Sequence, residues 1–149
     1  MDLSAVDKWG AIAELAGLLD SAGRLSSLPG FLSAVREREA QVSTGVGMGV
    51  GIPHGKSPAV FAPSIAFGRS HHGVNFAAID GEPAYLIFLL ALPDSLGNRE
   101  YMRALADLAR LLVHETFREG LLTATTVEEV MAVLQHARLE KGDGPPQDD

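Results

Sequence analysis

An uninterrupted apolar run constrains the fold of this chain more than any other feature of its sequence. The run is AYLIFLLAL, residues 84–92, and it lies between Pro83 and Pro93. It is too short to cross a bilayer, which takes about 20 apolar residues in a helix. Continuous rather than alternating hydrophobicity is typical of a strand that is buried on both faces. The run therefore predicts the central strand of a sheet that is covered by helices.

Two helices are predicted before this strand from their caps and their apolar spacing. The first covers residues 8–21, with Asp7 as its N-cap. Its expected apolar face consists of Ile12, Leu15, Leu18 and Leu19. The second follows the cap Ser27 and ends in the charged run REREA, residues 36–40, whose first two side chains we expect in solvent.

The rest of the chain is predicted to alternate between short strands and helices. Strands are expected at 49–52 and 64–68, and helices at 99–112, 116–122 and 127–138. Thr126 and Glu129 have the spacing of a capping box for the last helix. His71 and His72 are predicted to lie in a loop, and the Asp-Gly pair at 80–81 predicts a turn.

Composition excludes several classes of function. With 149 residues, 46% of them hydrophobic, the chain is expected to fold as one compact domain. A net charge of -7 disfavours a nucleic-acid partner, which needs clustered Lys and Arg. The absence of cysteine excludes disulfides, thiol catalysis and thiolate metal sites. No signal peptide and no spanning helix are expected, and the expected location is the cytoplasm.

The stretch most suggestive of chemistry is GVGMGVGIPHGKSP, residues 45–58. It does not match a dinucleotide-binding fingerprint, because Val50 stands where the third glycine is needed and Pro53 prevents an immediate helix. It does not match a P-loop either, because the G-K-S at 55–57 supplies only the end of that motif and position 50 lacks its first glycine. Nucleotide binding is therefore not predicted.

His54 is the candidate nucleophile within this stretch. Pro53 fixes its own φ and extends the residue before it, while Gly55 frees the backbone after the histidine, so a rigid platform at the end of a strand is expected. A neutral imidazole is a competent nucleophile near pH 7 and can accept a phosphoryl group. The residues alone leave a second interpretation open, in which His54 is a loop histidine bonded to a carbonyl.

Several segments together resemble a known family. They are DKWGAIAEL, REREAQVSTGVGMGVGIPHGKSPAV, GVNFAAIDGEPAYLIFLLALP, ADLARLL and ATTVEEVMAVL. They are similar to the type-2 enzyme IIA domains of the bacterial phosphoenolpyruvate-dependent sugar phosphotransferase system, of the fructose, mannitol and nitrogen-regulatory kind. The resemblance implies a three-layer α/β/α sandwich with a mixed parallel and antiparallel central sheet. It implies one such domain over residues 1–140, with the family's first strand shortened or missing, and a disordered acidic tail at 141–149.

The resemblance also implies roles for individual residues. His54 matches the histidine that accepts a phosphoryl group from the carrier protein HPr, or its nitrogen-branch relative, and passes it to a IIB component. Arg38 matches the arginine that stabilises phosphate charge, although a surface ion pair is its alternative. Thr44 and Gly55 are expected to support the site, and Tyr101 stands in place of the family's second histidine. No metal and no cofactor are expected.

Two further departures from the family pattern lie in the glycine run. Gly51 replaces the common alanine before I-P-H, and Met48 replaces a frequent polar residue between the glycines. Three functions follow from the resemblance: a sugar-transport phosphohistidine carrier, a nitrogen-branch regulator that signals through its phosphorylation state, and an interaction domain that is not phosphorylated. We expect the first of these, because both Arg38 and His54 are present.

Overall fold

The computed structural model describes residues 2–142, and the chain divides into two compact units between Met102 and Arg103. The division falls inside one helix, α3 (Asn98–Leu112), so the first turn of this helix belongs to the first unit. The expected tail at 141–149 lies outside the described residues except for its first two, which end the last helix. A single domain over residues 1–140 stays a prediction.

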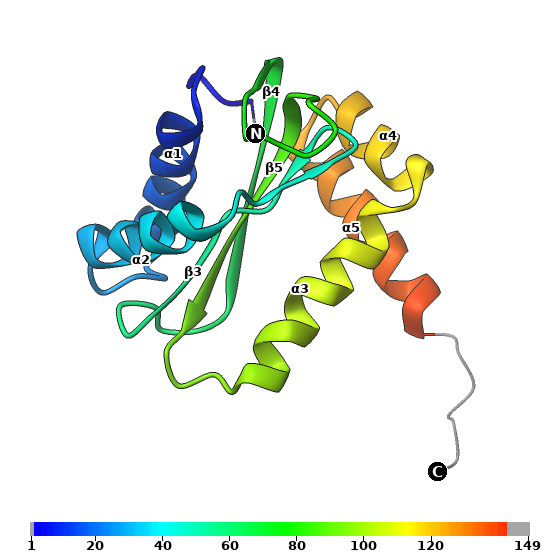
Figure 1. Cartoon of the computed structure of the whole chain (residues 1–149). Coiled ribbons are helices and arrows are strands. Elements are labelled where there is room, and N and C mark those ends of the chain that lie inside the picture. Colours follow the sequence, from blue (N-terminus) through cyan, green and yellow to red (C-terminus); the bar gives the residue numbers. More distant parts are fainter. Residues whose placement is uncertain (1, 143–149) are drawn as a thin grey trace. The chain divides into compact units, whose positions relative to one another are not determined.

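Two helices at the start of the first unit pack on the same side of its sheet (Figure 1). Helix α1 (Lys8–Ser21) has the predicted bounds, and Asp7 caps it by accepting a 2.7 Å hydrogen bond from Gly10 N. Helix α2 (Leu28–Gln41) is capped by Ser27, as predicted. The predicted apolar face of α1 is wrong at Leu18, which is 52% exposed, because Ala11 and Ala16 complete the buried face instead.

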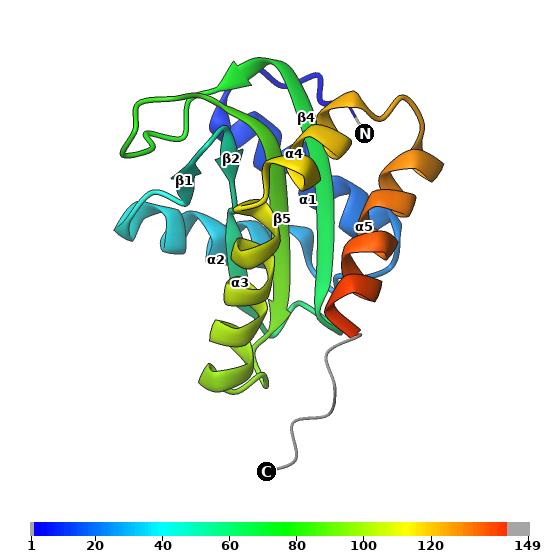
Figure 2. The same ribbon diagram turned by 90° about the vertical axis from the view of Figure 1, so that its right-hand side faces the viewer.

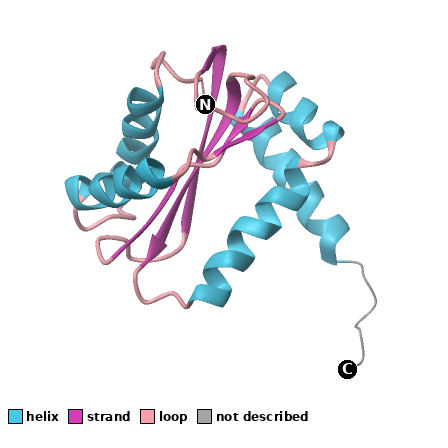
Figure 3. Cartoon of the chain, in the orientation of Figure 1, coloured by secondary structure: helices cyan, strands magenta, loops and turns pink. Residues whose placement is uncertain are grey.

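The sheet is built around β5 (Ala84–Pro93), which confirms the prediction of a central strand (Figure 3). Strands β2 (Val50–Gly51) and β3 (His54–Ser57) run parallel to one side of it. Strand β4 (Ser64–Val74) pairs antiparallel with its other side, and β1 (Gly45–Gly47) pairs antiparallel with β2. The sheet is therefore mixed, as expected.

Burial explains why the central run is continuously apolar. Ile87, Leu89 and Ala91 on one face of β5 belong to the core that it forms with α1 and α2. The alternate residues Leu86 and Phe88 are also buried, so both faces of the strand are excluded from water. A strand with one solvated face would instead alternate apolar and polar residues.

Strand β4 is longer than predicted, and His71 and His72 lie within it rather than in a loop. Gly68 does not end the strand, because its lack of a side chain serves a close contact. A Cβ at this position would lie 2.7 Å from Leu3 Cδ2. Pairing with β5 then continues, through an irregularity, to Val74. Such pairing between distant segments leaves no local signal in the sequence.

The second unit consists of the rest of α3, helix α4 (Glu115–Thr123) and helix α5 (Val127–Gly142) (Figure 2). Thr126 Oγ1 accepts from Glu129 N, which is half of the predicted capping box. The Glu129 carboxylate returns to the backbone of Thr125 instead of to Thr126. None of the helices among residues 2–142 has the length and apolar character that crossing a membrane requires.

Candidate functional site

His54 is positioned by a break between two strands that share one neighbour. β2 pairs with β5 at Leu86, and β3 resumes the same parallel pairing with His54 opposite Leu90. Pro53 lies in the break, and its carbonyl oxygen accepts from Leu90 N at 3.0 Å. His54 is therefore the first residue of β3, whereas the sequence predicted it just after the end of a strand. The pairing with β5 continues from His54 through residue 57.

The two ring nitrogens of His54 have different surroundings. Nδ1 lies 2.9 Å from the carbonyl oxygen of Ile52, and since a carbonyl only accepts, Nδ1 carries the proton in this contact. Nε2 then holds a lone pair. It is buried and has no hydrogen-bond partner among residues 2–142, in a side chain that is 4% exposed overall. The ring thus presents a desolvated nucleophilic nitrogen.

Electrostatics keep this imidazole neutral. Burial lowers the pKa of His54 below its ordinary value, because desolvation disfavours the charged ring, and the nearby positive charge of Arg38 lowers the pKa further. The hydrogen bond to Ile52 and the negative charge of Glu39 act in the opposite direction. Since the net shift is downward, the nucleophilic form predominates at neutral pH.

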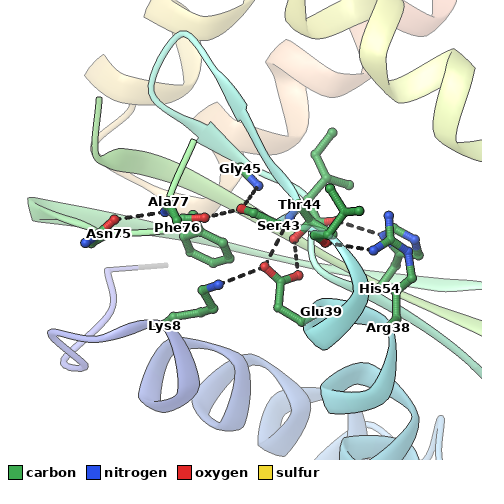
Figure 4. Close-up of polar contacts among 12 residues, drawn as sticks. Lys8, Arg38, Glu39, Ser43, Thr44, Gly45, His54, Asn75, Phe76 and Ala77 are labelled. Atoms are coloured by element: carbon green, nitrogen blue, oxygen red, sulfur yellow. Dashed lines mark hydrogen bonds and ion pairs between the residues drawn. The ribbon is translucent and has the colours of Figure 1, made fainter. Parts of the chain in front are cut away.

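Arg38 lies beside His54, at the C-terminal end of α2 (Figure 4). Its Nη1 donates to the carbonyl oxygen of Val42 at 2.8 Å, which fixes the guanidinium near the ring. No ion pair of Arg38 is found within the described part of the chain, 2–142, so the surface-ion-pair alternative has no partner there. A guanidinium held in this way keeps donors available for an anion.

Glu39 is a buried carboxylate for which the sequence predicted no role. Its Oε1 accepts from Thr44 N at 3.1 Å and from Lys8 Nζ at 3.0 Å, and its Oε2 accepts from Thr44 Oγ1 at 2.6 Å (Figure 4). A signal was available, because Glu39 follows Phe31 and Val35 at the four-residue spacing of one helix face. The alternating charges of the REREA run hid that spacing.

Thr44, an expected supporting residue, joins Glu39 to the strand that leads to His54. Its side chain and amide are bonded to Glu39, and its carbonyl oxygen accepts from Ile52 N at 2.9 Å. Ile52 in turn accepts from the ring of His54. Thr44 is itself buried, so this sequence of hydrogen bonds is shielded from water.

Gly55, the other expected supporting residue, has a role in packing. Its φ is not in the left-handed region, so the predicted freedom of the backbone is not what the position uses. A Cβ on Gly55 would lie 2.8 Å from Val35 Cγ2 and 3.1 Å from Val35 N. Glycine therefore allows α2, with Arg38 and Glu39, to approach β3 closely.

Tyr101 contacts His54 through its ring. It lies in the first turns of α3, and the two ring centroids are 5.7 Å apart with an edge arrangement at 61°. Lys56, two residues after His54 on β3, places its Nζ 6.0 Å from the centroid of Tyr101. The structure thus brings the predicted residues Arg38, His54 and Tyr101 together, and adds Lys56 to them.

The turn between β1 and β2 shows why the glycine run has its composition. Gly47, Met48 and Gly49 all have positive φ, at 84°, 58° and 76°. Asp80 holds this turn by accepting from Met48 N at 3.0 Å, and backbone amides around its carboxylate lower the pKa of Asp80. The Asp-Gly pair at 80–81 therefore does more than turn the chain.

Gly51 lies against a buried aromatic ring. A Cβ at this position would be 3.3 Å from three ring atoms of Phe76, which is fully buried. Ser43 Oγ donates to the carbonyl oxygen of Phe76 and accepts from Gly45 N, so the segment that carries Phe76 is bonded to the start of the run (Figure 4). This packing accounts for glycine at position 51.

Comparisons with known proteins agree on one family. Residues 1–137 match the model of the phosphoenolpyruvate-dependent sugar phosphotransferase system, EIIA 2. The fructose-specific EIIA component of Haloferax volcanii is 43% identical over 127 residues, which are 85% of this chain and 82% of that protein. The fructose-specific EIIABC component of Bacillus subtilis is 37% identical over 91% of this chain, which spans only 21% of that protein.

A solved structure supports the same relationship. The nitrogen regulatory protein IIA-Ntr from Neisseria meningitidis has a TM-score of 0.81 and 35% identity, and the match covers 90% of each chain. The mixed α/β fold is thus shared with a protein of clear sequence similarity.

Proposed function

This chain belongs to the EIIA 2 family of the phosphoenolpyruvate-dependent sugar phosphotransferase system, and from that premise we propose that it carries a phosphoryl group on Nε2 of His54. The observation that carries the proposal is the asymmetry of the ring. Nδ1–H is bonded to Ile52, while Nε2 is buried without a partner among residues 2–142 and lies in the field of Arg38. This arrangement suits a nucleophile that needs no separate base.

The proposed transfer needs one nucleophile and one donor phosphohistidine, and it uses no metal or nucleotide. The lone pair of Nε2 attacks phosphorus, the Nε2–P bond forms, and the N–P bond of a donor phosphohistidine breaks with its electron pair returning to the donor nitrogen. Nδ1 keeps its proton throughout. The guanidinium of Arg38 stabilises charge on the equatorial oxygens. Because Nε2 is shielded, the site has to open when the donor docks.

The proposed donor is HPr or its nitrogen-branch relative, and the proposed recipient is a IIB component. The Bacillus subtilis relative, named as a fructose-specific EIIABC component, supports a recipient of this kind. We propose that the reaction takes place in the cytoplasm and that residues 1–140 act as one IIA domain. Thr44, Gly55 and Tyr101 are proposed to support the site.

A regulatory function is the second candidate. It is favoured by the similarity to IIA-Ntr from Neisseria meningitidis, which is named as a nitrogen regulatory protein. The same His54 would be phosphorylated, and the phosphorylated and free forms would bind a target protein differently. A domain that is not phosphorylated is a weaker candidate, because it gives no reason for a desolvated nitrogen beside a guanidinium.

The test is phosphorylation of the purified protein with phosphoenolpyruvate, enzyme I and HPr, followed by intact-mass analysis. We expect an acid-labile gain of one phosphoryl group in the wild type and in His72→Ala, a change at an exposed histidine of β4. His54→Ala should show no gain. Absence of a gain in the wild type with both HPr and its nitrogen-branch relative, or a gain that survives in His54→Ala, would overturn the proposal.

A further inference from the structure

Glu39 is a buried carboxylate that the transfer step itself does not use. Its side chain is 1% exposed and carries three hydrogen bonds, two from Thr44 and one from Lys8. Burying a charge is costly unless it is paired and bonded, and even a paired buried charge contributes little to net stability. Stability alone therefore gives a weak reason for a carboxylate at this position, and its bonding partners indicate a more specific role.

The hydrogen bonds of Glu39 lead without interruption to the His54 ring. Glu39 holds the amide and hydroxyl of Thr44, the Thr44 carbonyl oxygen accepts from Ile52 N, and the Ile52 carbonyl oxygen accepts from Nδ1 of His54. We infer that Glu39 is a positioning residue, which acts through Thr44 and Ile52 to hold the imidazole with Nδ1 bonded and Nε2 available. The inference deepens the proposed function and rests on it for its effect on phosphoryl transfer.

The charge of Glu39 supports the same role. It raises the pKa of His54, against the larger effect of burial and the effect of Arg38. Among residues 2–142, Tyr101 on α3 contacts the ring, and Lys56 on β3 contacts Tyr101. Glu39 thus limits how far the basicity of the ring falls, and basicity is part of nucleophilic strength.

Glutamine is the informative replacement for Glu39. It has nearly the same shape but only one acceptor oxygen, so it cannot accept from the Thr44 amide, the Thr44 hydroxyl and Lys8 together. Glu37→Gln is the matched control, because Glu37 lies two residues earlier on α2, is exposed, and loses the same charge.

The experiment compares wild type, Glu39→Gln and Glu37→Gln by two measurements. Nitrogen NMR of the His54 ring reports its tautomer and its pKa, and quench-flow phosphorylation with HPr reports the transfer rate. For Glu39→Gln we expect a mixed tautomer, a pKa lower than in the wild type, and a rate lower by about tenfold or more, because the nucleophile is less well positioned. Glu37→Gln should match the wild type in all three.

Retention of the wild-type tautomer, pKa and rate by folded Glu39→Gln would overturn the inference. If that variant does not fold, Thr44→Val decides instead, because it keeps the shape and the backbone bond but removes the hydroxyl donor to Oε2. An unchanged tautomer and rate in folded Thr44→Val would then overturn it. If the wild type accepts no phosphoryl group, the proposed function fails, while the NMR measurements still decide whether Glu39 positions the ring.

Discussion

The two sides of the His54 ring differ in how completely they are bonded. On the Nδ1 side, Ile52, Thr44 and Glu39 satisfy one another in a buried network. Nε2 has no hydrogen bond among residues 2–142, although Arg38 and Tyr101 both lie near the ring. The bonded side fixes geometry in advance, and the other side keeps a reactive nitrogen available. Substitutions on the two sides should therefore have different consequences.

The largest effect is expected outside the bonded network of Nδ1, from Arg38→Met. Loss of the guanidinium removes charge stabilisation from the transferring group, and removal of one such donor lowers rates by about 100-fold or more. Arg36→Met, an exposed change on the same helix, is the control. The measurement is the rate of phosphoryl gain with HPr, and a loss equal to that of the control would mean that Arg38 is not part of the site.

The same variant tests the electrostatic difference through its pH dependence. Because the pKa of His54 lies below its ordinary value of 6.5, the acid limb of the rate should also lie below pH 6.5. Without Arg38 the pKa of His54 should rise, and the acid limb of the rate should move to higher pH.

The lowered pKa of His54 also affects stability. As the pH falls, the unfolded chain protonates His54 at a higher pH than the native protein does, so the free energy of unfolding should fall as the pH drops through 6.5 toward the native pKa. NMR titration in the native and urea-unfolded states checks the sign.

A smaller effect is expected from Gly55→Ala, at the residue that follows His54 on β3. The added Cβ would press on Val35, including its backbone nitrogen, so the free energy of unfolding should fall by about 1–3 kcal/mol. Gly17→Ala on α1 is the control, because no atom lies within 4 Å of its new Cβ, and there we expect a gain of about 0.5–1 kcal/mol. Urea unfolding measures both. Equal changes in the free energy of unfolding would show that the packing of α2 on β3 does not require this close contact.

The smallest effect is expected from Tyr101→Phe. The edge contact with His54 is retained by phenylalanine, and the hydroxyl makes no hydrogen bond to the ring, so the transfer rate should change by less than about fivefold. Tyr85→Phe, at a tyrosine on β5, is the control. A much larger loss in the phosphorylation assay would mean that the hydroxyl binds the phosphoryl group during transfer and replaces the family's second histidine in function.

The sequence predicted best where the cause is local. The bounds of α1 and the burial of β5 follow from caps, periodicity and a continuous apolar run, and both predictions are confirmed. The predicted length of β4 was wrong, because the observed length depends on pairing with β5 and on the contact between Leu3 and Gly68. Such contacts join residues that are far apart in the sequence.

The site shows the same division. His54 was predicted from its own sequence context and Arg38 from the family resemblance, and the structure brings the two together. The predicted role of Gly55, to free the backbone, was wrong, because its missing side chain instead makes room for Val35 on α2. Glu39 was missed because a charged run looks solvated until its helical face is considered, and its partners Lys8 and Thr44 lie outside that helix.

The contact between Gly51 and Phe76 couples the choice of residue at the two positions. An alanine at position 51 would press on the Phe76 ring at 3.3 Å, while a smaller residue at 76 would leave a void beside Gly51. Neither change is expected to be neutral by itself. The two positions therefore constrain each other, and Gly51→Ala should be tolerated better together with a smaller side chain at 76 than by itself.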